Sequence, residues 1–233
     1  GLALPLFYIK RFEVKMTKRR VVVTGMGALS PFGVGIDVLW KNLIEGKSGI
    51  RTLTCINIDE HLVHIGGEIK DFEPEKYLDP KEIKRTDRFI QLALIAAQEA
   101  FDDSKLDMSQ EDPSMVGTII GSGAGGFITT EREHNNMLAK GFYKCSPFTV
   151  PMLISNMAAG KVSMRFGLKG PNKAVVSACS TGAHSIGDAV RTIQYGDADV
   201  MIAGGTEAIM CDLGFGSFTS ARTLSKHNDE PER

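Results

Sequence analysis

The sequence is poor in residues that bind metal ions, and those present are not spaced as ligands. Its four cysteines include no CxxC pair, and its five histidines complete no zinc pattern with them. We therefore expect no metal site. Unpaired cysteines are typical of a reducing compartment, so we also expect free thiols at Cys55, Cys145, Cys179 and Cys211.

The chain also has no marked excess of charge of either sign. It carries 27 Lys and Arg residues against 28 Asp and Glu, which gives a net charge of −1. Proteins that bind nucleic acid or an anionic membrane surface are usually basic, so we expect neither partner here. Any charged partner must be recognised by a local patch of the surface.

Long hydrophobic runs are missing as well. The apolar stretch at the N-terminus contains Pro5 and ends at Lys10, which makes it too short for a membrane span or a signal-peptide core. Because Met16 follows it, we interpret residues 1–15 as an extension, such as an expression scar or a start codon placed too early. Residues 16–233 are then the folded unit.

Apolar segments of strand length alternate along the chain with segments of helical periodicity. With 42% hydrophobic residues, the chain can bury a sizeable core. The expected strands are residues 20–24, 115–120, 174–176 and 199–203. The expected helices are residues 37–44, 89–101, 129–140, a segment starting near Pro151 with Thr149 as its cap, and 181–195 with Gly196 at its end. This alternation predicts an α/β fold with a mostly parallel sheet.

The segment Val175–Gly187, VVSACSTGAHSIG, places a thiol between a β-branched run and a helix of small residues. At a helix N-terminus, free backbone N–H groups and the helix dipole favour a thiolate over a thiol. The same groups stabilise the oxyanion that forms when a thiolate attacks an acyl carbonyl. Cys179 is therefore a candidate nucleophile. The alternative is a buried structural cysteine, the common fate of a free thiol.

The sequence around Cys179 resembles the active-site motif of a known enzyme family. The similar stretch is ACSTGAHSIGDA, and others follow the family's order from Lys18 to the last residue: KRRVVVTGMGALSPFG, IIGSGAGG, SPFTVPMLISNMAAG, GLKGPN and YGDADVMIAGGTEA. The chain thus resembles the β-ketoacyl-acyl-carrier-protein synthases of the elongating, II-like type. This resemblance favours Cys179 as the nucleophile. Initiating synthases and chalcone synthases surround their cysteine differently, and chain-length factors lack it.

The resemblance implies a thiolase-like fold, in which two similar halves form α-β-α-β-α layers, with residues 16–233 as the N-terminal half. It implies that Cys179 accepts an acyl chain from the phosphopantetheine arm of acyl carrier protein. Decarboxylative Claisen condensation with malonyl-carrier protein, a step of fatty-acid elongation, would follow. No other cofactor is implied. The two histidines, the lysine and the glycine-rich loop that the family's second half supplies have no match here.

The histidines of this chain do not fill that gap. His184 follows Cys179 too closely, on the same expected helix, and we interpret His61, His64, His134 and His227 as surface residues.

The family forms homodimers, joined in part along residues 173–176 here, and occurs in compartments such as the bacterial cytoplasm or the mitochondrial matrix. The alternative from another class is a non-catalytic fragment or assembly half that only forms interfaces.

The resemblance also implies secondary sites. Ala124, in the GSGAGG loop, would face the acyl pocket and leave room for longer chains, and Phe218 would line the pocket, with a plain core role equally open. A basic cluster would attract the acidic carrier protein, unless it is only a solvated face: Lys81, Lys84, Arg85 and Arg88. Arg222, near the expected mouth of the pocket, has the same two interpretations.

Two glycine patterns leave a nucleotide-binding α/β protein as a third hypothesis. The pattern from Gly25 to Ser30 lacks the third glycine of GxGxxG, and the one from Gly121 to Gly126 lacks the acidic partner. Both patterns fit better as turns of a condensing enzyme. Tight binding of NAD(P)H in calorimetry would favour the nucleotide hypothesis.

Overall fold

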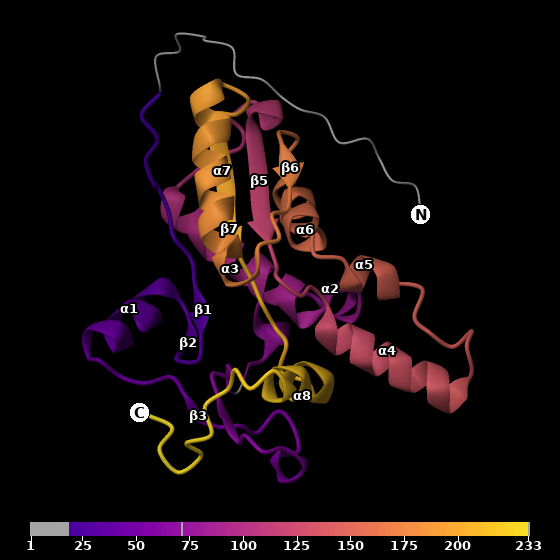
Figure 1. The fold of residues 1–233 in the computed structure, drawn as a ribbon. Helices are drawn as coiled ribbons and strands as arrows, with labels where there is room; N and C mark the ends of the chain where they lie inside the picture. The colour runs from indigo at the N-terminus through magenta and orange to yellow at the C-terminus, as the bar shows by residue number, and fades with distance from the viewer. Residues whose placement is uncertain (1–18, 71, 233) are drawn as a thin grey trace, which may run out of the picture.

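The computed structural model describes residues 19–70 and 72–232, which form a layered α/β fold (Figure 1). The interpretation of residues 1–15 as an extension lies outside the described residues. Within the two described ranges, every helix is too short or too polar to cross a membrane.

A parallel sheet forms the middle layer. Its order is β6 (Asn172–Lys173), β5 (Val116–Gly121) and β7 (Val200–Gly205). β5 pairs with β7 along its whole length and with β6 more briefly. Because the three strands run parallel, their C-terminal ends lie at one edge of the sheet.

Helices cover both faces of this sheet. α3 (Arg88–Ser104) packs against α6 (Met157–Phe166), which lies on β5, while α7 (Thr181–Tyr195) packs against β5 and β7. Figure 1 shows α7 in front of the strands and α3 behind them. The described chain is thus an α-β-α arrangement.

The main core lies between the sheet and the α3–α6 pair. Phe89, Ile90 and Leu94 of α3 and Val162 of α6 are completely buried within it. Full burial of an apolar side chain of this size contributes about 1.5–3 kcal/mol. Asp87 begins α3, because its carboxylate accepts a hydrogen bond from the Phe89 N–H at 3.2 Å.

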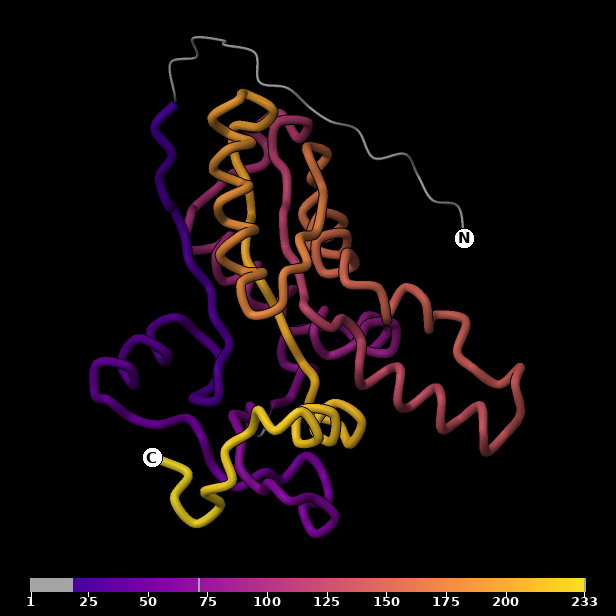
Figure 2. The backbone as a smooth tube through the Cα atoms, viewed as in Figure 1, coloured from indigo at the N-terminus to yellow at the C-terminus, as the bar shows by residue number. Residues whose placement is uncertain are grey.

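Smaller elements surround these layers. In the N-terminal part they are the hairpin of β1 (Leu29–Ser30) and β2 (Gly33–Val34), α1 (Ile36–Ile44), and the hairpin of β3 (Arg51–Thr52) and β4 (Ile65–Gly66). Further helices are α2 (Pro80–Lys84), α4 (Phe127–Lys140), α5 (Thr149–Leu153) and α8 (Asp212–Ser220). Short 3₁₀ turns are η1 (Ile58–Glu60), η2 (Pro74–Lys76), η3 (Pro113–Met115) and η4 (Ala178–Ser180). Figure 2 shows α4 extending away from the sheet and returning through a loop to α5.

Most of the expected elements are confirmed. The strands expected at 115–120 and 199–203 are β5 and β7, and the helices expected at 37–44, 89–101 and 129–140 are α1, α3 and α4. The helix expected at 181–195 is α7, and Gly196 ends it with a left-handed φ of 86°. Periodicity located α3, which buries an apolar stripe, and all residues of β5 are buried. By contrast, α1 has no buried residue, and the buried residues of α4 are polar.

The strand expected at residues 20–24 is wrong. The segment is coil, and Val22 and Val23 are 64% and 77% exposed. A strand needs a neighbour for its backbone N–H and C=O groups, and no described residue pairs with this segment. The following residues are held against α3 instead, through the N–H groups of Met26 and Ala28, which donate to Asp103 and Glu99 at 2.9 Å each.

Three further expectations need correction. β6 covers residues 172–173 rather than 174–176, although Val175 still lies against the end of β5 at Gly121. Thr149 is the first residue of α5 and not its cap; its hydroxyl donates to the Ser146 carbonyl at 2.6 Å. The single helix expected from Pro151 is two helices, because the chain is extended at Ile154 before α6 begins.

Candidate active site

Three segments meet at the edge where the parallel strands end. β5 leads into the glycine-rich loop of residues 122–126, β6 leads toward the turn that contains Cys179, and β7 leads into Thr206 and Glu207. In open α/β sheets this edge is the usual place for a ligand site. The topology therefore brings the predicted nucleophile and the predicted pocket loop to the same edge.

Cys179 lies in the η4 turn, two residues before α7 begins at Thr181. The residue is exposed, so its interpretation as a buried structural cysteine is wrong. Ala178, just before it, has a φ of 52°, a left-handed conformation that is strained for a residue with a side chain. Because Cys179 lies just before α7, the positive end of the helix dipole is next to it. Among the described residues, no side chain caps this N-terminus.

Two hydrogen bonds hold the turn onto the first part of α7. The backbone N–H of Ser177 donates to the Thr181 hydroxyl at 2.9 Å. The Ser177 hydroxyl and Nδ1 of His184 form a second bond at 2.7 Å. His184 is thus engaged in holding the turn.

Bare backbone lets α7 approach the sheet at this end. A Cβ atom on Gly205, the last residue of β7, would lie 2.9 Å from the Cα of Gly182. A Cβ atom on Gly121, the last residue of β5, would lie 2.5 Å from a methyl carbon of Thr181. Both distances are too short for a real side chain, so glycine is required at each strand end.

The other thiols are less suited to act as nucleophiles. Cys55 as a residue is exposed, but desolvation of its thiol, reinforced by the Glu68 carboxylate, raises its pKa to about 12. Burial raises the pKa of Cys211 to about 11. Both thiols therefore stay protonated at neutral pH.

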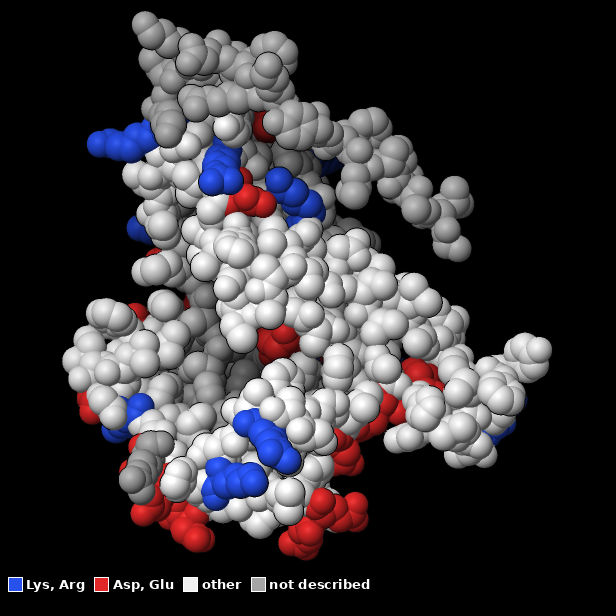
Figure 3. Space-filling view, viewed as in Figure 1, with Lys and Arg blue, Asp and Glu red and all other residues white. Residues whose placement is uncertain are grey.

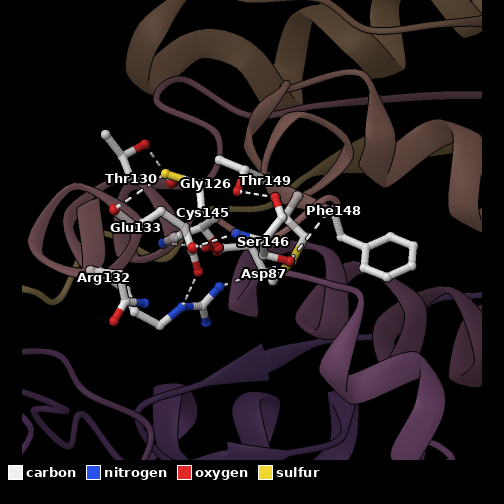
Figure 4. A network of polar contacts seen from close by, with 12 residues as sticks. Asp87, Gly126, Thr130, Arg132, Glu133, Cys145, Ser146, Phe148 and Thr149 are labelled. Carbon is white, nitrogen blue, oxygen red and sulfur yellow. Dashed lines mark hydrogen bonds and ion pairs between the residues drawn. The ribbon is translucent and has the colours of Figure 1, made fainter. Parts of the chain in front are cut away.

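Cys145 belongs to a polar network that fastens the loop after α4 (Figure 4). Its thiol donates to the backbone carbonyl of Glu133 at 3.7 Å. The Glu133 carboxylate accepts from the Ser146 N–H at 2.8 Å and pairs with Arg132 at 2.9 Å. The Ser146 bond lowers the pKa of Glu133, so this carboxylate stays charged and continues to hold the loop at neutral pH.

Ala124 lies in the loop after β5. The loop is bound by Glu207, whose carboxylate accepts from the N–H groups of Gly123 and Ala124 at 2.9 and 3.1 Å. Sequence reasoning missed Glu207, and its only signal was a carboxylate directly after an apolar strand. The same bonds speak against the nucleotide hypothesis, because a carboxylate occupies the N–H groups that a phosphate would need.

A cleft of about 970 Å³ opens beside this edge, between the N-terminal segment, α3 and the end of β7. Figure 3 shows it as a hollow next to α1. Glu207 lines the cleft on one side and Glu68 and Arg88 line it on another, whereas Cys179 is not part of its wall. The cleft is therefore distinct from the surface that the nucleophile faces.

The predicted secondary residues are scattered. Phe218 lies on α8 and is 45% exposed, so its interpretation as plain core is wrong. Arg222 is exposed just after α8 and has a left-handed φ of 57°. Figure 3 shows positive side chains over the C-terminal segment and near the top of α7, with a largely uncharged surface between them.

The basic cluster before α3 divides into two kinds of residue. Lys81 and Lys84 are exposed on α2. The guanidinium of Arg85 lies 4.7 Å from the ring centre of Phe148, and that of Arg88 lies 4.6 Å from the ring centre of Phe72. Arg88 is half-buried, and it also donates to a backbone carbonyl, so it supports the fold more than it presents charge.

Two of the four remaining histidines are not surface residues as expected. The side chain of His61 is 11% exposed, pairs with Asp212 at 3.1 Å and packs edge-on against Phe215. His64 is half-buried and contacts the His61 carbonyl at 2.9 Å. The expectation is confirmed for the other two, which are exposed: His134 and His227.

Comparison with known proteins gives consistent matches. The family model described as "Beta-ketoacyl synthase, N-terminal domain" matches residues 18–233. The chain is 45% identical over 218 residues to 3-oxoacyl-[acyl-carrier-protein] synthase 2 of Coxiella burnetii, covering 94% of this chain and 53% of that protein. The protein of the same name from Staphylococcus aureus strain COL is 47% identical over 211 residues, covering 91% and 51%. The chain thus spans about half the length of the curated relatives it matches.

Solved structures agree. A β-ketoacyl synthase from Burkholderia phymatum matches with a TM-score of 0.80 and 25% identity, over 93% of this chain and 53% of that one. The ishigamide ketosynthase/chain length factor matches with a TM-score of 0.79, also at 25% identity, over 90% and 52%. These matches confirm the expected thiolase-like α/β fold, with this chain as its N-terminal half.

Proposed function

Because the chain belongs to the β-ketoacyl synthase family, through that family's N-terminal domain, we propose that it forms the acyl-accepting part of a 3-oxoacyl-acyl-carrier-protein synthase of fatty-acid elongation. One observation supports this most directly: an exposed thiol, Cys179, lies at the uncapped N-terminus of a 15-residue helix. The names of the bacterial relatives point to the same reaction.

In the proposed first step, Cys179 Sγ attacks the carbonyl carbon of an acyl thioester on the phosphopantetheine arm of acyl carrier protein. Negative charge develops on the carbonyl oxygen, where backbone N–H groups at the start of α7 can stabilise it. The C–S bond to the arm then breaks, and the released pantetheine thiolate takes up a proton. The product is an acyl group on Cys179, ready for a second half-reaction.

The second half-reaction needs the two histidines and the lysine that the family's second half supplies, and no segment of this sequence matches them. Decarboxylation of malonyl-carrier protein would generate the carbanion that attacks the acyl-cysteine. We assign that step to the part of the relatives' length that this chain does not span. No metal or further cofactor belongs to the proposal.

The remaining assignments follow from the same proposal. Ala124 forms a wall of the acyl site, with Phe218 as a further lining residue. Positive side chains that the structure leaves exposed dock the carrier protein, namely Lys84, Arg85 and Arg222. The intact enzyme is a homodimer, and we place it in the bacterial cytoplasm, with the mitochondrial matrix as the alternative.

Intact-mass spectrometry of the full-length protein after incubation with acyl-carrier protein tests the acyl acceptor. We expect the mass of one acyl group to be added, and this addition to be lost completely in Cys179→Ala. Cys145→Ala is the matched control, because it removes another thiol, in the loop after α4, and should still be acylated. Acylation that survives in Cys179→Ala would refute the assignment.

The half-length match favours one second candidate, a non-catalytic assembly half. The isolated chain of 233 residues tests it with malonyl-carrier protein added to the same assay. A chain that takes up acyl groups but forms no condensation product is the acyl-accepting part alone. A chain that is folded and takes up nothing supports the assembly role.

A further inference from the structure

The carboxylate of Glu207 is bonded to the loop that follows β5. Its Oε2 accepts from the N–H groups of Gly123 at 2.9 Å and Ala124 at 3.1 Å. Its Oε1 accepts from the Ser122 hydroxyl at 2.9 Å, and that hydroxyl oxygen accepts from the Gly125 N–H at 2.9 Å. Glu207 and Ser122 together therefore bind three consecutive N–H groups of the loop.

This loop lies directly against the turn that contains Cys179. A Cβ atom on Gly123 would come 3.5 Å from the Cα of Ala178 and 2.9 Å from Glu207 Oε2. Ala178 is the strained residue just before the nucleophile. The loop is thus held between Glu207 on β7's side and the nucleophile turn on β6's side.

We propose that Glu207 is a positioning residue for acyl transfer, which holds the loop of residues 122–126 against the Cys179 turn. It thereby fixes Ala124 as a wall of the acyl-chain site. The proposal rests on the proposed function of Cys179. In this role Glu207 touches neither the substrate nor the reacting sulfur.

The chemistry of the contact calls for a carboxylate. Both oxygens of Glu207 are acceptors, and they serve two N–H groups and one hydroxyl at once. A glutamine keeps one acceptor for the two N–H groups, but its amide nitrogen cannot accept the Ser122 proton. An alanine leaves the glycine-rich loop without an acceptor, and glycines then allow many other loop conformations.

The test compares Glu207→Ala and Glu207→Gln in the full-length protein with wild type. Acylation rates are measured with a series of acyl thioesters from short to long. We expect the best substrate to react about tenfold to a hundredfold more slowly in Glu207→Ala, because misplaced binding groups have effects of that size. The rates for different chain lengths should also converge, with Glu207→Gln between the two.

Glu99→Ala is the matched control. Its carboxylate accepts from the N–H groups of Ala28 at 2.9 Å and Ile36 at 2.7 Å, so it holds a different loop by the same kind of bond. We expect this variant to keep the wild-type acylation rates and chain-length preference. If Glu99→Ala and Glu207→Ala lowered the acylation rate equally, the proposal would be overturned, because the decrease would indicate a general loss of structure.

Two further measurements separate positioning from other roles. Alkylation of Cys179 by iodoacetamide needs no acyl site and should stay near the wild-type rate in Glu207→Ala. Hydrogen exchange at residues 123–125 should become faster in that variant. If wild type accepts no acyl group at all, the proposed function fails, and the exchange data still decide on Glu207: unchanged exchange overturns its hold on the loop, and faster exchange supports it.

Discussion

Two apolar segments of this protein have similar compositions and different fates. β5 contains Val116, Ile119 and Ile120, and all of its residues are buried between helices and two neighbouring strands. Residues 20–24, RVVVT, have more β-branched residues for their length, yet they remain coil with exposed valines. Intrinsic preference therefore does not explain which of the two is a strand.

The difference lies in the available partners. β5 exchanges backbone hydrogen bonds on both of its edges, whereas residues 20–24 have no backbone neighbour in the described chain. Strand preference mostly measures how a side chain packs on a pleated, half-buried surface. Without such a surface, three consecutive valines do not make a strand.

The largest expected contrast is in hydrogen exchange. Amides of β5 should exchange only when the whole fold opens, whereas those of residues 21–24 should exchange almost as in an unfolded chain. The free energies of opening should differ by about 5 kcal/mol or more, since that is the scale of global stability. Exchange followed by NMR or mass spectrometry measures both segments in one sample. Protection of residues 21–24 comparable to β5 would contradict the contrast.

Truncation of one apolar side chain in each segment gives the next largest contrast. Ile119→Ala should lower the free energy of unfolding by about 2–5 kcal/mol, because it leaves a cavity in the core. Val23→Ala, at a residue that is 77% exposed, should change it by less than about 0.5 kcal/mol. Urea denaturation of the two variants compares them directly. An equal decrease in the free energy of unfolding in both variants would mean that residue 23 is buried in solution.

The smallest expected effect concerns how the coil segment is held. A Cβ atom on Gly27 would lie 2.0 Å from the Ala96 carbonyl oxygen of α3. Gly27→Ala should therefore push the segment off α3, at a cost of about 1–3 kcal/mol. Trypsin cleavage after Arg19 or Arg20 should become faster as the segment detaches.

Gly187→Ala is the control for this substitution. A Cβ atom on Gly187 would meet nothing within 4 Å, and its position inside α7 should make alanine more stable by about 0.5–1 kcal/mol. Trypsin cleavage at the N-terminal segment should not change. If Gly27→Ala leaves cleavage unchanged as well, the contact with α3 is not what holds the segment.

The same distinction explains how far the sequence could predict this fold. α3 was predictable because its apolar stripe lies within one segment. α7 was predictable from the glycine that ends it, although its buried residues are small or polar. β5 and β7 were predictable because each is a mainly apolar run of strand length. The failure at residues 20–24 arose because strand pairing depends on residues far away in the sequence, which no local pattern contains.

The candidate site shows the same division. Cys179 was predicted as a candidate from its own segment, since the turn, the thiol and the following helix are contiguous. Glu207 was not found, because its role depends on two parallel strands ending at the same edge. Thr149 was misplaced by one residue, because its hydroxyl donates to the nearby Ser146 carbonyl and the helix begins at Thr149 itself.

The contact between Gly182 and Gly205 has a consequence for how this site can vary. At this contact the backbones of β7 and α7 lie directly against each other, with no side chain between them. A methyl group added at Gly205 would lie 2.9 Å from the Cα of Gly182 and would have to shift the start of the helix, with Cys179 moving along with it. Reacting groups must be held within about 0.5 Å, so even an alanine in place of Gly205 would disturb the geometry of the site.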